Sequence, residues 1–137
     1  MAHVVVDSRY GFGRTLAHTT VAQAVEKVTA ALKAEGFGVL TSIDVKDTMK
    51  KKLDVDFRPY VILGACNPVL AHKALSADPQ IGLLLPCNVV VQEAEGGDAA
   101  VSIADPRAMF TLVDNEALKP IVDEADQQLR RVAASLS

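Results

Sequence analysis

The sequence predicts a two-layer α/β sandwich of the α+β type, with a mixed or mostly antiparallel sheet that carries its helices on one face. Strand and helix signals follow one another in the order βαββαββα, an order typical of this architecture. The apolar residues of each helical segment form a stripe on one side, which indicates that each helix packs through a single face. Hydrophobic residues make up 50% of the chain, which is enough for a real core.

The length of 137 residues predicts one domain, 1–137, with a core of about 10–136 and an N-terminal extension of 1–9. Four Phe, two Tyr and no Trp are present, so the interior must be mainly aliphatic.

The first half of the chain shows alternating strand and helix signals. Tyr10–Ala17 contains two glycines and predicts a first strand, either at an edge or close to another backbone. Thr20 and Gln23 have the spacing of a capping box, so a helix should begin there and end at Gly36. The every-second-residue pattern of Phe37–Val45 predicts a strand with one buried face.

The middle of the chain predicts a short helix, a strand and a second full helix. Asp47 or Thr48 can cap a helical turn that runs through Leu53. The apolar run Tyr60–Ala65 predicts a central strand covered on both faces. Asn67 is a favoured helix cap, so a helix is expected over Pro68–Ala77, with proline at its first position.

The second half predicts a hairpin after an irregular apolar approach at 81–85. Strands Asn88–Ala94 and Ala99–Ala104 flank Glu95–Asp98, whose glycines suit a tight turn. Asp105–Arg107 should close the second strand in a turn. A last helical segment opens at Asn115, is kinked or restarted by Pro120, and continues to the C-terminus.

The net charge and the N-terminal sequence exclude some classes of partner and location. The net charge of -3 and the pI near 5.5 leave no basic field for a phosphate backbone, so no nucleic-acid partner is expected. The N-terminus shows neither a signal peptide nor a membrane span, so we expect a cytoplasmic protein without a membrane partner. In that reducing compartment its two cysteines should be free thiols.

The candidate site is the pair of cysteines, each followed directly by asparagine. Cys66 stands just before a predicted helix, where backbone amides and the helix dipole favour a thiolate. We therefore predict a small-ligand site formed by Cys66, Asn67, Cys87 and Asn88, and as a weaker hypothesis a soft-metal site at Cys66 and Cys87. The alternative is that each cysteine is a small core residue without reactivity.

The relative direction of two strands decides whether the thiols can act together. If the strand that ends at Cys66 and the strand that begins near Cys87 are antiparallel neighbours, both thiols lie at one end of the sheet. They would then be near enough for a redox pair or a two-sulfur metal site. If the strands are parallel, the thiols lie at opposite ends.

Further metal ligands are not indicated by spacing. The candidates by residue type stand in no recognised pattern: His3, His18, His72, Met49 and Met109. His72 is expected on the solvent side of its helix, and a haem held by His or Met stays an open alternative. The carboxylates near residue 50 could bind a hard cation, although a solvated surface paired with lysines is simpler: Asp44, Asp47, Asp54 and Asp56.

Several segments, in order, resemble signature segments of the domain of unknown function 302 family. They are Gly36–Val45, Tyr60–Pro68, Gly82–Val91 and Asp105–Met109. The resemblance extends from about Tyr10 to Leu136. It implies a small bacterial or archaeal α/β sandwich, commonly a homodimer, with no established activity. The family pattern often has Glu where this chain has Ser42, so an acidic pair with Asp44 is not expected to operate here.

These observations leave three readings open. The preferred one is a homodimeric α/β domain with a small-ligand or soft-metal site around the Cys66-Asn67-Pro68 helix start and Cys87. The second is a non-catalytic structural or protein-interaction module. The third is a thiol-redox or haem-binding protein, and whether the chain is an enzyme stays open.

Overall fold

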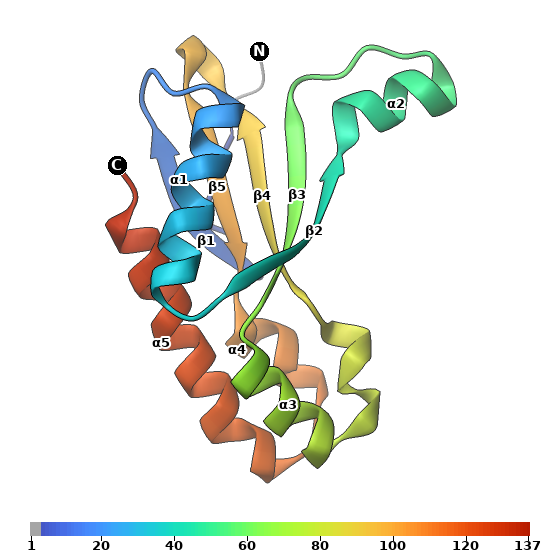
Figure 1. The fold of residues 1–137 in the computed structure, drawn as a ribbon, viewed down its shortest axis with the longest axis vertical. Coiled ribbons are helices and arrows are strands. Elements are labelled where there is room, and N and C mark those ends of the chain that lie inside the picture. Colours follow the sequence, from blue (N-terminus) through green and yellow to red (C-terminus); the bar gives the residue numbers. More distant parts are fainter. Residues whose placement is uncertain (1–3) are drawn as a thin grey trace.

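The computed structural model describes residues 4–137 and shows one five-stranded sheet, with the helices over 21–34 and 119–135 packed on one face (Figure 1). The strands are β1 (Gly11–Leu16), β2 (Gly38–Asp44), β3 (Tyr60–Cys66), β4 (Cys87–Glu93) and β5 (Ala99–Ala104). Their order in the sheet is β1-β5-β4-β3-β2, and every neighbouring pair is antiparallel. The predicted two-layer sandwich is therefore confirmed, with a fully antiparallel sheet.

Five α-helices and four 3-10 segments connect the strands. The α-helices are α1 (Val21–Ala34), α2 (Val45–Leu53), α3 (Pro68–Ala77), α4 (Pro106–Met109) and α5 (Lys119–Ser135). The 3-10 segments are η1 (Pro79–Leu84), η2 (Glu95–Gly97), η3 (Phe110–Leu112) and η4 (Glu116–Leu118). In the part of the chain that the structure describes, no helix is both long and apolar enough to cross a membrane.

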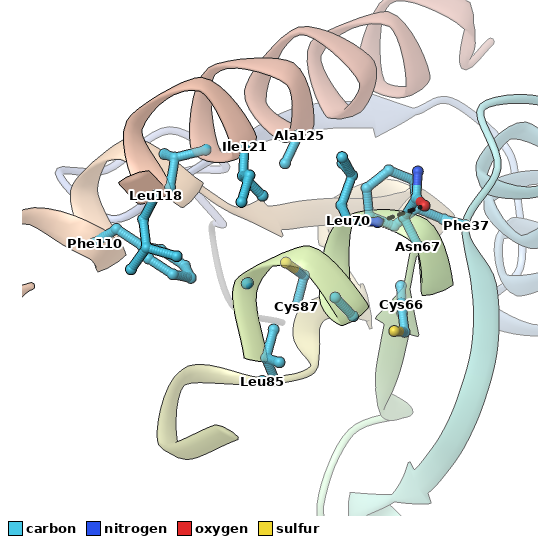
Figure 2. A pocket seen from close by; sticks show the side chains of 14 residues that line it. Phe37, Cys66, Asn67, Leu70, Leu85, Cys87, Phe110, Leu118, Ile121 and Ala125 are labelled. Atoms are coloured by element: carbon cyan, nitrogen blue, oxygen red, sulfur yellow. Dashed lines mark hydrogen bonds between the residues drawn. The ribbon is translucent and has the colours of Figure 1, made fainter. Parts of the chain in front are cut away.

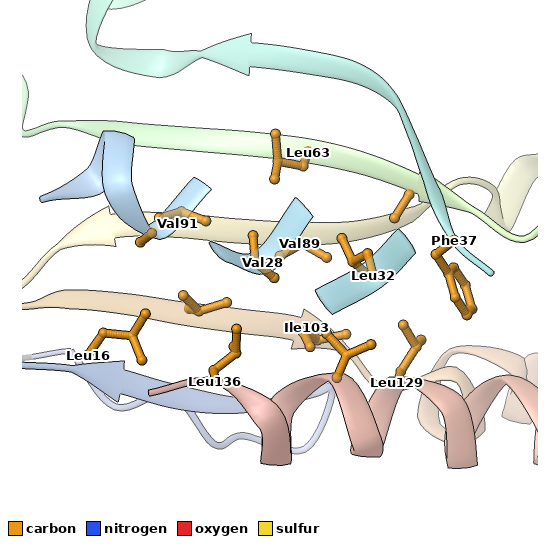
Figure 3. Packing of buried hydrophobic residues seen from close by; sticks show 14 of the residues in the cluster. Leu16, Val28, Leu32, Phe37, Leu63, Val89, Val91, Ile103, Leu129 and Leu136 are labelled. Carbon is orange, nitrogen blue, oxygen red and sulfur yellow. The ribbon is translucent and has the colours of Figure 1, made fainter. Parts of the chain in front are cut away.

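The main core lies between the sheet and the helices α1 and α5 (Figure 3). One row across the sheet, made of Phe12, Ile103, Val89 and Leu63, faces these helices and is buried. Helix α1 contributes Val28 and Leu32, and α5 contributes Leu129, all of them fully buried. A second, smaller cluster of Ala74, Ile81 and Leu118 lies below the sheet, among α3, η1 and η4.

The helix caps form at the residues predicted from the sequence. The hydroxyl of Thr20 accepts from the amide of Gln23, and the Gln23 side chain accepts from the amide of Thr20, so the predicted capping box forms. Gly36 takes a positive φ of 85° after α1. Helix α3 begins after Asn67, as predicted, and Pro120 lies in the first turn of α5.

The strand over 37–45 was predicted with one buried face, and this prediction is wrong. Phe37, just before β2, is buried, but within β2 only Val39 is even half-buried. Two features explain the exposure. Strand β2 is an edge strand, and a register shift between Val39 and Thr41 interrupts its pairing with β3.

Three further predictions, on β3, α2 and the segment after β5, differ from the structure. Strand β3 was predicted to be covered on both faces, whereas Tyr60 and Ile62 stay half-buried because the helices cover only the other face. Helix α2 begins at Val45, earlier than predicted, because the carboxylate of Asp44 accepts from the amide of Asp47. The predicted turn after β5 is a short helix, α4, capped by Asp105.

Candidate functional site

Both cysteines lie at the same end of the sheet, because β3 and β4 are antiparallel neighbours. Ala65 is paired with Cys87 in the β3–β4 register, and Cys66 follows as the last residue of β3. Both cysteines therefore lie at one end of the sheet, but Cys87 shares its face with Ala65, so Cys66 points to the opposite face. Both are free thiols.

The two cysteines border a small cavity of about 40 Å³ beside the main core (Figure 2). Its walls come from the ends of β3 and β4, from α3, from η3 and η4, and from the first half of α5. The other lining residues are Phe37, Ala65, Asn67, Leu70, Ala71, Ala74, Leu85, Phe110, Leu118, Ile121, Val122 and Ala125. The surface of the cavity is almost entirely apolar, so it suits an apolar group better than a hydrated ion.

The two thiols are harder to ionise than a free cysteine. Burial raises the pKa of Cys66 above its ordinary value. Burial, with a smaller contribution from the neighbouring Cys66, raises the pKa of Cys87 to about 11. Both side chains are therefore neutral thiols at physiological pH, which favours contact with uncharged ligand atoms.

The predicted easier ionisation of Cys66 is thus wrong, and Asn67 supplies the physical reason. The side-chain oxygen of Asn67 accepts from the amides of Val69 at 3.1 Å and Leu70 at 3.3 Å. These helix-start amides are the groups that would have stabilised a thiolate, and they are already occupied. Desolvation then dominates the pKa of Cys66.

Both the oxygen and the nitrogen of the Asn67 side chain take part in hydrogen bonds within the protein. Its amide nitrogen donates to Oε1 of Gln128 on α5 at 3.0 Å, while its oxygen caps α3. The structure therefore assigns Asn67 to holding the wall of the cavity in place.

Asn88 does not join the other three predicted site residues. Alternate residues of β4 point to opposite faces of the sheet, so Cys87 faces the helices while Asn88 faces the open side. Asn88 is exposed there and borders a shallow groove of about 360 Å³ on the open sheet face. The structure thus places Cys66, Asn67 and Cys87 around the cavity, whereas Asn88 shares with Cys87 only a separate hollow of about 30 Å³ beside Pro86.

The metal-ligand candidates are dispersed. Across residues 4–137 no group of three or more His, Cys, Asp or Glu side chains is placed to hold a metal ion. His72 is exposed on α3, as predicted, and His3 lies outside the described residues. Near α2, Lys50 pairs with Asp54 at 3.1 Å and Lys51 pairs with Asp47 at 2.9 Å, which makes this acidic group a paired surface.

Sequence reasoning missed the wall of the cavity that lies far along the chain from both cysteines. Phe110, Ile121 and Ala125 come from η3 and α5, and only tertiary folding brings them to the thiols. The apolar stripe of α5 was the one available signal, since a stripe predicts a buried face without naming its neighbour.

Comparison with known proteins decides the family. The family model described as "Domain of unknown function DUF302" matches residues 12–136. The chain belongs to the DUF302 family. A solved structure, "Crystal structure of uncharacterized conserved protein DUF302 from Bacillus stearothermophilus", is similar to this DUF302 chain with 29% sequence identity and a TM-score of 0.82. The match covers 95% of this chain and 100% of that one. A search of the curated proteins found no match.

Proposed function

We propose that this DUF302 chain is a small-ligand-binding domain whose site is the thiol-lined cavity. The proposal is based on one observation: Cys66 and Cys87, from neighbouring strands, both border the same apolar cavity. The part of the ligand that enters should be apolar and uncharged, because the walls are apolar and both thiols are neutral. A reducing cytoplasmic location would keep the thiols free.

Xenon tests the cavity directly, because it is small, apolar and detectable through the shifts of neighbouring backbone amides in NMR spectra. We expect shifts confined to residues around the cavity, with Leu70 and Ala125 among them. Cys87→Leu should abolish these shifts by filling the space. A matched change on the surface, Leu83→Ala, should leave them intact, since Leu83 is 82% exposed. Shifts absent from the unmodified protein, or unaffected by Cys87→Leu, contradict the proposal.

A soft metal or haem is the alternative occupant of the same place. A two-thiolate metal site would require both thiols to lose protons, and burial opposes this. The absorption spectrum and elemental analysis of the freshly purified protein test this alternative. A stoichiometric metal that is lost in a Cys66→Ser variant would replace the apolar-ligand proposal.

A second candidate function, self-association as a homodimer, is favoured by the open face of the sheet. The middle row across this face is Gly13, Ser102, Val90, Ile62 and Ile43. The rows beside it are also uncharged: Gly11, Ala104, Asn88, Gly64 and Thr41 on one side, and Thr15, Ala100, Gln92 and Tyr60 on the other. Charge reaches these rows from Arg58, whose guanidinium donates to Oε1 of Gln92 at 2.8 Å near the Tyr60 ring. A sheet face made for water normally carries charged residues in its strands, so the uncharged rows suit a second copy of the chain.

Sedimentation or light scattering tests the dimer. We expect the unmodified chain to associate and Val90→Lys to dissociate it, because a charge would lie at the centre of the uncharged face. Leu83→Lys is the matched control, since Leu83 is 82% exposed and lies in η1, outside the strands of the sheet. A monomer at high protein concentration, or a dimer that tolerates Val90→Lys, would rule out this interface.

A further inference from the structure

Phe110 is a shared wall of three hollows. It borders the thiol-lined cavity of about 40 Å³, an outer groove of about 420 Å³ along the start of α5, and a hollow of about 30 Å³ beside Pro86. Leu118 and Val122 also separate the cavity from the groove, but both are buried in the protein interior. Phe110 is only half-buried, so it is the most exposed of these three side chains.

The segment Phe110–Asp114 is anchored by hydrogen bonds at its two ends, and between them Phe110 and Val113 pack against the small cluster of Ala74, Ile81 and Leu118. At one end Asp105 caps α4 through the amides of Arg107 at 2.9 Å and Ala108 at 3.3 Å. At the other end the side chain of Asn115 accepts from Ala117 at 3.0 Å and donates to the carbonyl of Ala77 at 3.4 Å.

Between these two ends, the hydrogen bonds of the segment join residues that are close in sequence. Thr111 donates to the carbonyl of Ala108, and the amide of Val113 donates to the carbonyl of Phe110. Within residues 4–137, no hydrogen bond or ion pair ties Phe110–Asp114 to a part of the protein beyond α4. A short segment of this kind opens at a lower free-energy cost than the sheet core does.

The outer groove is lined by one more acidic than basic side chain. Arg107 is held by Asp123 at 3.3 Å and by Asp126 at 3.4 Å, so its charge is already balanced. The remaining charged groups that line the groove are Asp114, Glu116 and Lys119, two acids and one base. The groove therefore favours a positively charged group over a negatively charged one.

We propose that Phe110 is the gate of the thiol-lined cavity, and that the ligand is a short amphiphile with an apolar chain and a cationic end. The chain passes Phe110 and lies against Cys87, while the cationic end stays in the outer groove near Asp114 and Glu116. This inference rests on the proposed function for the identity of the site, and it adds the access route and the ligand class.

The gate is tested by the rate at which iodoacetamide alkylates Cys87 in a Cys66→Ser background, followed by mass spectrometry. Phe110→Ala should increase this rate by about tenfold or more, because labelling of a protected thiol follows the population of the open form. Leu112→Ala is the matched control on the same segment, since Leu112 is 86% exposed, and it should leave the rate within about twofold. Equal rates for Phe110→Ala and Leu112→Ala overturn the gate.

Two further measurements separate gate opening from loss of folding. Phe110→Leu keeps an apolar wall of smaller size, and its labelling rate should lie between those of the parent and Phe110→Ala. Low concentrations of urea should leave the labelling rate of each variant unchanged, because local opening exposes little surface. A rate that rises with urea in parallel with global unfolding contradicts the gate.

The ligand class is tested by protection of Cys87 with propylamine and butanoate, which carry the same propyl chain with opposite end charges and are small enough for a cavity of about 40 Å³. Propylamine should slow alkylation in the Cys66→Ser protein, and butanoate at the same concentration should not. Equal protection by both contradicts the cationic end. If neither compound protects Cys87 and xenon also fails to bind, the proposed ligand-binding function is contradicted. The labelling rates of the Phe110 variants test the gate independently of that result.

Discussion

The side-chain nitrogen of Asn67 lies 3.0 Å from Oε1 of Gln128, and this contact ties the start of α3 to α5 across one wall of the cavity. The same side chain caps α3 through its oxygen. Both ends of one amide therefore hold the position of the helix that carries Leu70 and Ala74 into the protein.

Replacing Asn67 should reveal which of its two contacts matters more. We expect Asn67→Ala to lower the free energy of unfolding by about 1–2 kcal/mol, since it removes both the cap and the contact with Gln128. Asn67→Asp keeps the capping oxygen, so urea denaturation should show less than half of that loss. Equal losses for the two variants would mean that the cap is not the origin of the effect.

The thiol of Cys87 should make stability depend on pH in the alkaline range. Its pKa is about 11 in the folded protein, against an ordinary value of 9.0. Between these two values the unfolded chain loses a proton that the folded chain keeps, so the free energy of unfolding falls as pH rises. The slope from this one group is at most about 1.4 kcal/mol per pH unit.

Urea denaturation between pH 8 and pH 10.5, roughly the window in which a free thiol titrates, checks this dependence. Cys87→Ala should flatten the fall relative to the parent protein, and Cys66→Ala should flatten it less, because Cys66 is less deeply buried. Identical pH profiles for the parent and Cys87→Ala would contradict a buried neutral thiol.

Gly64 should tolerate no side chain, because β3 is crowded at this position. A Cβ on Gly64 would collide with the hydroxyl of Thr41 and lie 2.8 Å from Cγ of Pro86. We expect Gly64→Ala to destabilise the fold by about 1–3 kcal/mol through this overpacking. Thermal unfolding with Gly38→Ala as the control checks it, since a Cβ on Gly38 would meet nothing within 4 Å. Similar losses in the two variants would point to backbone effects instead.

The buried carboxylate of Asp126 should contribute to stability through the two arginines that it contacts. It is 3% exposed and lies 3.4 Å from nitrogens of both Arg107 and Arg130. Asp126→Asn should cost about 1–3 kcal/mol, a value reduced from that of a fully buried pair because the arginines are half exposed. Asp123→Asn, at a more exposed carboxylate, should cost less than about 1 kcal/mol in the same assay. The reverse order would show that burial does not set the contribution.

The sequence predicted local structure well and tertiary neighbours poorly. Caps such as Thr20 and Asn67 act within a few residues, so their signals are complete in the sequence itself. The exposure of β2 could not be predicted, because it follows from the place of this strand at the edge of the sheet.

In the candidate site, too, the sequence predicted local features better than tertiary neighbours. The neighbouring position of Cys66 and Cys87 followed from one condition, the antiparallel pairing of β3 and β4. The sequence grouped Asn88 with the cysteines because a repeated Cys-Asn pattern does not reveal that Asn88 faces the open side of the sheet. Phe110 carries no sequence signal at all, since its role depends on where η3 packs against the thiols.

The turn between β4 and β5 offers a practical consequence. Gly96 and Gly97 take φ angles of 70° and 79° there, at the far end of β4 from Cys87. An exposed loop tip of this kind accepts inserted residues more readily than regular structure does. A peptide tag or a fluorescent reporter inserted between these two glycines would therefore provide a handle for immobilising or following the protein while leaving both sulfur atoms untouched.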